Sequence, residues 1–366
     1  MKLEILKDAL ANAIYKSEKI AVKNATLPVL SCVLITASKN AVKIRTTNLD
    51  IGLEISIPAK VEVEGAIAVP ANILNSFLNG LGNEKSIILE ADENKLSVLT
   101  SHVSTSINLL NHNDYPTIPI ISEGESFLIN SSDFTKGVKA VYYSSAVSSM
   151  KPELASVFIY TDGDWIYFVA TDSFRLAEKK IKAGKRKEFS PLLIPFKNTI
   201  EIARIFENVN GEIKVIVGKN QISIFYENFY ITSRVVDGNF PDYKQFFPKD
   251  FLTEVVVLKQ DIIDIFKLSN IFSDNFNRIR FEINPSRKTF EIITKNTSIG
   301  ENTSKVDAVL KGESVDLSFN YKYIADSFQS IDSDSIGFYF NGPNKPAIMK
   351  GISDNSFNYM VMPMNR

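Results

Sequence analysis

Apolar and polar residues along this chain form blocks that alternate with a period of two, typical of strands, and blocks with a helical period. A short apolar strand runs into a helical block three times, at residues 69–74, 194–200 and 319–324. The spacing is 125 from position 69 to 194 and again from 194 to 319. A fixed spacing of this kind indicates internal repeats, which constrain the architecture more than any single motif.

Two further sets of segments follow the same repeat. Residues 3–8, 127–133 and 255–261 each predict a strand that leads into a helix, and their acidic or hydroxyl residues suit helix starts. Residues 33–35, 157–159 and 281–283 predict strands, each followed by a turn and another strand. Each unit is therefore predicted as strand, helix, three strands, helix and then three or four strands. The predicted fold class is α+β, with three repeated domains in which two helices pack on antiparallel sheets.

Prolines indicate where the repeats meet, because proline removes a backbone donor and interrupts strand pairing. Pro116 and Pro119 follow the first unit, and Pro248 lies in the segment 247–250 after the second. The predicted domains are residues 1–121, 122–250 and 251–366.

Composition supports a folded protein in all three units, since 45% of the residues are hydrophobic and 23% are charged. The first residues alternate charged and apolar side chains, unlike a signal peptide, and no run of 18 apolar residues occurs. We therefore expect a cytoplasmic protein without membrane contact. The single cysteine, Cys32, lies in an apolar run and is expected in the core.

Charge is balanced along the whole chain, with 41 Lys and Arg against 42 Asp and Glu and a net charge of −1. This excludes the globally basic surface that many nucleic-acid binders use. Any contact with nucleic acid must come from locally segregated lysines and arginines.

The chain contains little that predicts catalysis. His102 and His112 have no neighbouring ligand motif, so we expect no metal, and no phosphate-binding loop, dinucleotide fingerprint or nucleophile elbow appears. The run Thr171-Asp172-Ser173 lacks an evident general base and is better explained as a turn beside a strand. Paired carboxylates, as in glycosidases, leave no sequence signature. An oligomeric enzyme or carbohydrate-active protein built on repeated α+β units therefore stays one of the possible functions.

Several segments together resemble one known family. They are residues 26–30, 48–54, 69–71, 170–177, 236–243 and 362–364. In this order and spacing they resemble the bacterial sliding clamp, the beta subunit of DNA polymerase III, over the whole chain. The resemblance implies a ring formed by a head-to-tail homodimer, with sheets outside and helices lining a channel for double-stranded DNA. It implies no catalytic activity and no cofactor. The implied partners are the replicative DNA polymerase, other clamp-binding-motif proteins and an ATP-driven clamp loader.

The size of the repeat agrees with a dimeric ring. A unit of this length is a sphere about 36 Å across. Three such spheres in a closed ring leave a hole about 6 Å wide, and six leave one about 36 Å wide. Because B-DNA is roughly 20 Å across, two chains can surround it and one cannot. Repeats joined head to tail present unlike ends, which suits a heterologous contact that closes on itself.

The resemblance places a hydrophobic peptide-binding cleft between the second and third domains. The matching residues are Leu154, Thr171, Ser173, Phe174, Arg175, Leu176, Pro241, Phe246, Asn320, Tyr323, Met360, Val361, Met362, Pro363 and Met364. Methionines and aromatics form deformable apolar pockets, and Arg175 and Asn320 can fix a peptide backbone. The alternative is that the C-terminal methionines belong to an edge strand packed on a core. Phe174 and Phe246 depart from the family pattern and predict a different peptide preference.

The expected DNA-facing residues are basic or polar side chains on helices and at the channel rim. They are Lys23, Asn24, Lys136, Lys139, Ser149, Lys151, Lys197 and Arg204. On spacing alone, Lys197 and Arg204 share a helix face, as do Lys136 and Lys139, and such faces are commonly just solvated. The corresponding helix of the first unit, 71–74, carries no positive charge. We expect loose phosphate contacts without base readout.

The resemblance places Ile107 and Leu268 at the dimer interface, where family members bury apolar side chains. Ile107 taken alone would more often be an ordinary core residue.

Overall fold

The computed structural model describes residues 1–24, 26–121, 123–182, 188–248 and 250–364. Residues 122 and 249, which fall in the predicted boundary regions, lie outside this description. The first repeat holds β1 (Lys2–Leu6), α1 (Lys7–Glu18), β2 (Cys32–Ser38), β3 (Ala41–Thr47), β4 (Ile51–Pro58), β5 (Lys60–Val63), β6 (Gly65–Pro70), α2 (Ala71–Gly80), β7 (Ser86–Ala91), β8 (Lys95–Leu99) and β9 (Ser104–Asn108). The second holds β10 (Glu125–Asn130), α3 (Ser131–Val141), β11 (Ser156–Asp162), β12 (Trp165–Thr171), β13 (Arg175–Lys182), β14 (Leu192–Pro195), α4 (Phe196–Ile205), β15 (Glu212–Val217), β16 (Gln221–Tyr226) and β17 (Phe229–Arg234). The third holds β18 (Thr253–Leu258), α5 (Lys259–Ile271), β19 (Arg278–Asn284), β20 (Thr289–Asn296), β21 (Gly300–Lys305), β22 (Ala308–Gly312), β23 (Val315–Asn320), α6 (Tyr321–Ser327), β24 (Ser335–Phe340), β25 (Ala347–Gly351) and β26 (Phe357–Val361).

The three predicted registers are confirmed. The helices α2, α4 and α6 begin at Ala71, Phe196 and Tyr321, so the spacing of 125 is kept. The strands β1, β10 and β18 each run directly into a helix, and β2, β11 and β19 each precede a turn and a further strand. Asp8 and Asp261 lie in the first turns of α1 and α5, where a carboxylate interacts favourably with the helix dipole.

The predicted count of three strands between the two helices of each unit is wrong. The described residues place five there in the first and third repeats and four in the second. The strand that leads into the second helix adds to the count, and so do short strands such as β5, whose sequence Lys-Val-Glu-Val is mostly exposed. A short, solvent-facing edge strand needs little apolar patterning, so it leaves a weak sequence signal.

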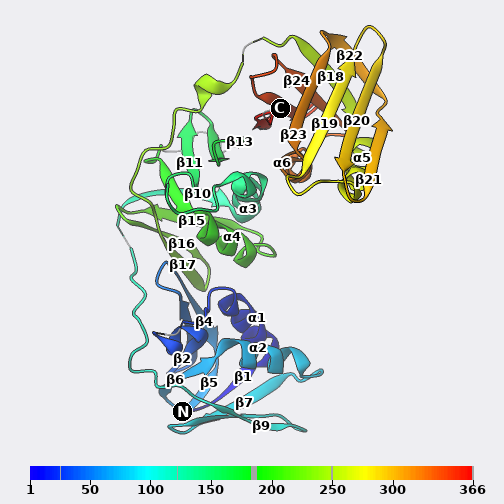
Figure 1. The fold of residues 1–366 in the computed structure, drawn as a ribbon. Coiled ribbons are helices and arrows are strands. Elements are labelled where there is room, and N and C mark those ends of the chain that lie inside the picture. The colour runs from blue at the N-terminus through cyan, green and yellow to red at the C-terminus, as the bar shows by residue number, and fades with distance from the viewer. Residues whose placement is uncertain (25, 122, 183–187, 249, 365–366) are drawn as a thin grey trace. The chain divides into compact units, whose positions relative to one another are not determined.

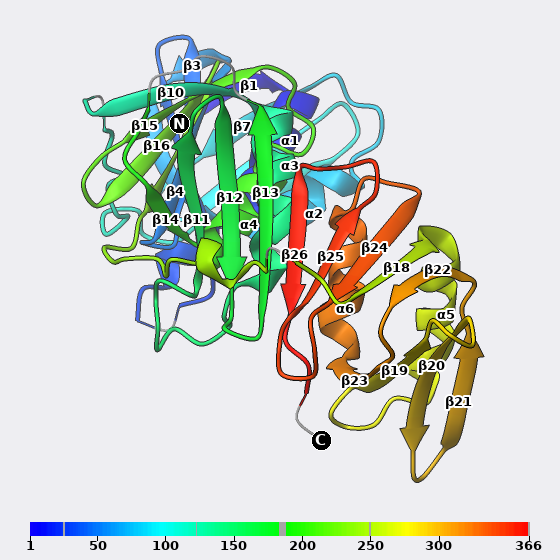
Figure 2. The same ribbon diagram turned by 90° about the horizontal axis from the view of Figure 1, so that it is seen from above.

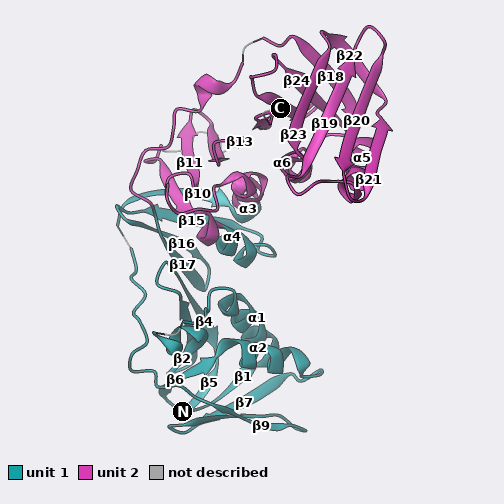
Figure 3. Cartoon of the chain, viewed as in Figure 1, with its two compact units in different colours: residues 1–132, 200–235 teal, residues 133–199, 236–366 magenta. Residues whose placement is uncertain are grey.

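The chain divides into two compact units that cut across the repeats, residues 1–132 with 200–235 and residues 133–199 with 236–366 (Figure 3). Each unit contains strand pairing between successive repeats. In the first unit β4 pairs with β17, which joins the first and second repeats and is called the first junction here. In the second unit β13 pairs with β26, which joins the second and third repeats and is called the second junction. Each compact unit therefore contains complete hydrogen-bonded sheets, whereas each repeat is a continuous stretch of sequence.

Each unit has two sheets. In the first unit they run β5-β1-β7-β8-β9 and β10-β15-β16-β17-β4-β3-β2-β6, with α1 and α2 packed on each other beside them (Figure 1). In the second unit a nine-stranded sheet runs β14-β11-β12-β13-β26-β25-β24-β18-β22, and its central strands lie side by side in Figure 2. The second sheet of that unit runs β21-β20-β19-β23.

The helices bury their apolar faces against these sheets, as the sequence pattern predicts. In the first unit Leu10 and Ile14 of α1 are fully buried. In the third repeat Phe266 of α5 packs edge-on against Phe281 of β19, with ring centroids 6.2 Å apart. Such aromatic pairs add to the stability gained from buried area. None of the helices in the described part of the chain is long and apolar enough to cross a bilayer.

Candidate peptide-binding pocket

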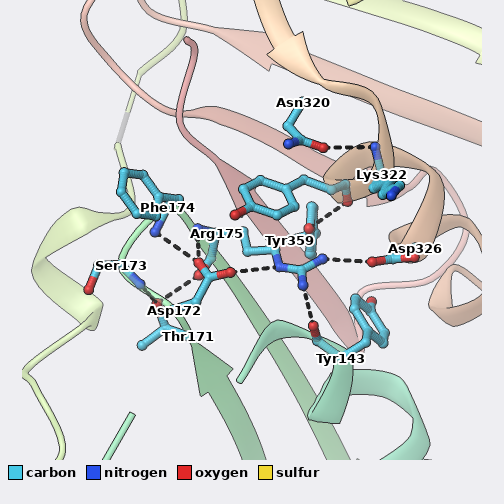
Figure 4. Close-up of polar contacts among 11 residues, drawn as sticks. Tyr143, Thr171, Asp172, Ser173, Phe174, Arg175, Asn320, Lys322, Asp326 and Tyr359 are labelled. Atoms are coloured by element: carbon cyan, nitrogen blue, oxygen red, sulfur yellow. Dashed lines mark hydrogen bonds and ion pairs between the residues drawn. The ribbon is translucent and has the colours of Figure 1, made fainter. Parts of the chain in front are cut away.

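The second junction begins at a tight turn between β12 and β13. Thr171 Oγ1 donates to the carbonyl of Arg175 at 2.7 Å, and Asp172 Oδ1 accepts from the backbone N–H groups of Phe174 and Arg175, both at 2.9 Å. Ser173 has φ of 78°, a left-handed conformation that a tight turn needs and that is uncommon for residues other than glycine. The side chains of Ser173 and Phe174 project from this turn (Figure 4). Phe174 is 61% exposed.

Arg175 follows the turn and contacts groups from both the second and the third repeat (Figure 4). Its Nε donates to Asp172 Oδ2 at 3.0 Å, its Nη1 to Asp326 Oδ2 at 2.7 Å and its Nη2 to the carbonyl of Tyr143. Its guanidinium also lies over the ring of Tyr323, 4.3 Å from the centroid. Burial disfavours the charge on Arg175, but its neighbours, including both carboxylates, favour it, and the pKa of the guanidinium is raised overall.

An open cavity of about 720 Å³ lies beside this turn. The structure brings these residues of the predicted cleft to its wall: Leu154, Thr171, Ser173, Phe174, Arg175, Leu176, Pro241, Phe246, Met360 and Met362. Backbone pairing explains the meeting of distant segments, because Leu176 lies opposite Met360 in the β13–β26 ladder. In this wall, Tyr243 packs with Leu176 and Met360 in a buried cluster. The cavity is called the pocket from here on.

The other residues predicted for the cleft lie outside the pocket wall. Val361 is fully buried, the backbone N–H of Met364 donates to the carbonyl of Ser318 at 2.7 Å, and Pro363 lies between them in the chain. Asn320 caps α6, because its Oδ1 accepts from the N–H of Lys322 at 3.0 Å. This bond uses one lone pair of the side-chain oxygen, and the expectation that Asn320 fixes a peptide stays a prediction. Tyr323 contributes indirectly, through its contact with Arg175.

Several residues of the pocket wall were missed by the sequence analysis. They are Glu153, Tyr243, Gln245, Phe247, Pro248, Asn341, Asn344, Lys345 and Pro346. Residues 341–346 form the connection between β24 and β25, and their Gly and Pro content signals a turn without showing what the turn faces. Lys151, which we predicted at the DNA rim, also lines the pocket.

The remaining predicted DNA-facing side chains are mostly exposed. Lys23, Lys136, Lys139, Ser149, Lys197 and Arg204 are exposed. Lys136 pairs with Asp332 at 3.0 Å, and Arg204 pairs with Glu201 at 2.8 Å. Burial raises the pKa of the Glu201 carboxyl despite the nearby Arg204.

The apolar side chains on and just after the helix α4 differ in burial. Ala203 and Phe206 are buried, whereas Ile200 is only partly buried. Asn24 accepts the backbone N–H groups of Thr26 and Leu27, so its side chain stabilises a local turn.

The two residues predicted for the dimer interface differ in exposure. Leu268 on α5 is 55% exposed, but Ile107 on β9 is 4% exposed within the single chain. This burial fits the alternative that Ile107 is an ordinary core residue, and its place at the dimer interface stays a prediction. Its backbone still belongs to β9, the edge strand of that sheet.

No cluster of three or more His, Cys, Asp or Glu that could hold a metal occurs among the described residues. The burial of Cys32 raises the pKa of its thiol to about 11 and leaves it a core residue, as expected.

Three α+β repeats joined by strand pairing, with a pocket at the second junction, define the class of DNA clamp proteins. The chain belongs to the DNA polymerase III beta subunit family. Family models match its N-terminal domain at residues 1–119, its central domain at 128–242 and its C-terminal domain at 244–365.

Similar proteins agree over the full length. The beta sliding clamp of Pseudomonas aeruginosa is 26% identical and covers 100% of both chains, and that of Synechococcus elongatus is 24% identical and covers 92% of both. Among solved structures, the beta subunit from Thermotoga maritima has a TM-score of 0.93 at 23% identity, covering 100% of this chain and 99% of that chain. A Pseudomonas aeruginosa sliding clamp bound to griselimycin has a TM-score of 0.91 at 25% identity, with 100% of both chains covered.

Proposed function

We propose that this chain is a sliding clamp, a non-catalytic processivity factor that encircles duplex DNA in the cytoplasm and tethers other proteins to it. The observation that carries the proposal is the strand pairing between repeats. At the first junction β4 of the first repeat pairs with β17, the last strand of the second repeat. At the second junction β13 of the second repeat pairs with β26, the last strand of the third. Among the described strands, the same rule identifies two that have no partner of this kind.

Those two strands are β21 and β9. The strand β21 of the third repeat corresponds to β4 and β13, and β9 of the first repeat corresponds to β17 and β26. Both are the outermost strands of their sheets. An open edge with free backbone donors and acceptors readily pairs with another strand. Two copies that pair β21 with β9 head to tail would repeat the internal junction twice more and close a ring.

Apolar side chains beside β21 support a contact between copies. Leu268 and Ile271 on α5 are 55% and 59% exposed, and Ile299 just before β21 is 61% exposed. The ring of Phe272 lies against Gly300, which brings the end of α5 to the start of β21. Exposed apolar groups grouped in this way are typical of the buried centre of a subunit interface.

Leu268→Asp should therefore convert the dimer into monomers, because it buries an unpaired carboxylate at the contact. Sedimentation velocity measures the mass. Val309→Asp is the matched control, since Val309 is 72% exposed on β22, and it should stay dimeric. A dimer that survives Leu268→Asp would contradict this interface.

For DNA we propose loose phosphate contacts from Lys136, Lys139, Lys197 and Arg204 on the helices α3 and α4, with Lys23, Asn24, Ser149 and Lys151 at the rim. With a net charge of −1 the attraction must be local, and it should weaken as salt rises.

For protein partners we propose that the pocket binds an apolar peptide segment of the replicative polymerase, the clamp loader and other clamp-binding proteins. Phe174→Ala should weaken binding of a labelled peptide carrying leucine and phenylalanine by roughly tenfold, because it removes an aromatic wall. Val147→Ala is the control, since Val147 is 82% exposed and does not line the pocket. Equal affinity of Phe174→Ala and the unaltered chain would remove Phe174 from the site.

Encirclement is tested by topology. After loading by a clamp loader, the protein should remain on nicked circular duplex DNA during gel filtration and should leave when a restriction enzyme linearises the circle. Retention on linear DNA with open ends would indicate ordinary binding and contradict the proposal.

A further inference from the structure

We propose that Asp326, on α6 outside the pocket, is a positioning residue that prepares the pocket for its peptide by acting through Arg175. The inference rests on the proposed role of the pocket as a peptide-binding site. It assigns the affinity of the pocket partly to a residue that does not line it.

The first step is the contact between repeats. Asp326 belongs to the third repeat and Arg175 to the second, 151 residues apart, and their side chains meet at 2.7 Å. The side chain of Arg175 is 11% exposed and that of Asp326 is 41% exposed. A charge-assisted hydrogen bond with one partner this buried is stronger than an exposed ion pair.

The second step runs from Arg175 to the pocket wall. Arg175 Nε donates to one oxygen of Asp172, and the other oxygen of Asp172 accepts from the N–H groups of Phe174 and Arg175. The guanidinium thus fixes the carboxylate that shapes the turn at Ser173. Three of the five N–H donors of Arg175 are occupied, by Asp172, Asp326 and the Tyr143 carbonyl.

The third step links the two sides of the pocket. The backbone N–H of Met362 donates to the carbonyl of Phe174 at 2.8 Å, so the C-terminal segment of the third repeat is bonded to the turn of the second. Tyr359 donates to the carbonyl of Tyr323 at 2.6 Å, which ties β26 to α6. The ring of Tyr323 lies against Arg175. Arg175 therefore contacts or stabilises elements on both sides, and a pocket held in its binding geometry loses less entropy when a peptide binds.

The test compares Asp326→Asn with a matched control. Asp332→Asn removes another ion pair between the second and third repeats, Lys136 to Asp332 at 3.0 Å, but that pair is exposed and far along the chain from the turn. Asp326→Asn should weaken binding of the labelled leucine and phenylalanine peptide about tenfold, as expected for loss of a buried charge-assisted bond. Asp332→Asn should change it by less than about twofold. Asp326→Glu keeps the carboxylate and should recover part of the affinity.

Amide hydrogen exchange supplies a readout that does not depend on the peptide. In Asp326→Asn the N–H groups of Phe174, Arg175 and Met362 should exchange faster than in the unaltered chain, and in Asp332→Asn they should not. If Asp326→Asn binds the peptide with unchanged affinity while Arg175→Ala does not, Arg175 is a direct contact and the inference is overturned. If the unaltered chain fails to bind the peptide, the proposed function of the pocket fails first.

Discussion

The first and second junctions use the same backbone but differ in what their side chains build. In each, a turn leads into a strand that pairs antiparallel with the last strand of the next repeat. Leu49 in the first turn has φ of 79° and Ser173 in the second has φ of 78°, at positions 124 residues apart. Neither residue is a glycine, so both turns adopt an uncommon conformation that the surrounding hydrogen bonds must stabilise.

Those hydrogen bonds match as well. Thr47 Oγ1 donates to the carbonyl of Ile51 at 2.9 Å, and Thr171 Oγ1 donates to that of Arg175 at 2.7 Å. The turn is therefore a feature of the repeat itself, independent of the pocket.

The side chains that follow the turn decide the outcome. In the first junction Gly52 leaves room for the Ile118 side chain, which would lie only 2.8 Å from an added Cβ. In the second junction the corresponding position is Leu176, which lines the open pocket. The position before it is Ile51, 1% exposed, in the first junction and the ion-paired Arg175 in the second. The side chain of Ile118 thus covers the first junction. The second junction has the open pocket and the ion-paired Arg175 at the matching positions.

The largest expected change in stability comes from placing an arginine in the first junction, at the position that matches Arg175 in the second. Ile51→Arg should destabilise the protein by about 3–5 kcal/mol, because Ile51 is buried and the introduced charge lacks the carboxylates that surround Arg175. Urea unfolding measures the change. Leu49→Arg on the same turn, where the side chain is 50% exposed, should cost less than about 0.5 kcal/mol. Equal losses for the two variants would mean that burial at Ile51 does not distinguish the junctions.

Tyr115 and Tyr243 lie in the connections that follow β9 and β17, the last strands of the first and second repeats. Tyr115 donates to the backbone carbonyl of Cys32 at 3.0 Å, whereas Tyr243 donates to the carboxylate of Glu178 at 2.6 Å. Burial raises the pKa of both phenols, so both act as neutral donors at physiological pH. Tyr243→Phe should cost about 2 kcal/mol and Tyr115→Phe about 1 kcal/mol, because a hydrogen bond to a charged acceptor is the stronger.

Thermal unfolding of the two phenylalanine variants measures this difference under one condition. A larger loss for Tyr115→Phe would contradict the stronger hydrogen bond assigned to Tyr243.

The smallest effect concerns pH. Glu54 in the first junction is 6% exposed; burial opposes its charge, but hydrogen bonds from Arg45 and Lys43 outweigh it and lower the pKa of the carboxyl below its usual 4.5. A lowered folded-state pKa adds stability above the unfolded pKa and loses it as pH falls through the folded pKa. The stability gap between the unaltered chain and Glu54→Gln should therefore be full near neutral pH and shrink below 4.5. A gap independent of pH would contradict the ion pairing.

The sequence predicted the repeat well because strand and helix blocks recur with constant spacing, and Ala71, Phe196 and Tyr321 begin helices as the spacing requires. It predicted much of the pocket wall through family resemblance. It could not predict the contact of Arg175 with Asp326, since the two residues are 151 positions apart and no local pattern links them. For Ile107 the sequence left two interpretations open, because alternation shows that a strand has two faces but does not show which face is buried.

The proposed ring depends on a third junction, made between two copies by β21 and β9. Thr303→Cys on β21 and Ser106→Cys on β9 place exposed thiols on the two edges, while Cys32 stays buried. With a short bis-maleimide, the chain carrying both cysteines should give a covalent dimer on a denaturing gel, and each single-cysteine chain should stay monomeric. Crosslinking of the Ser106→Cys chain to itself would mean that like ends meet, and it would contradict a head-to-tail ring.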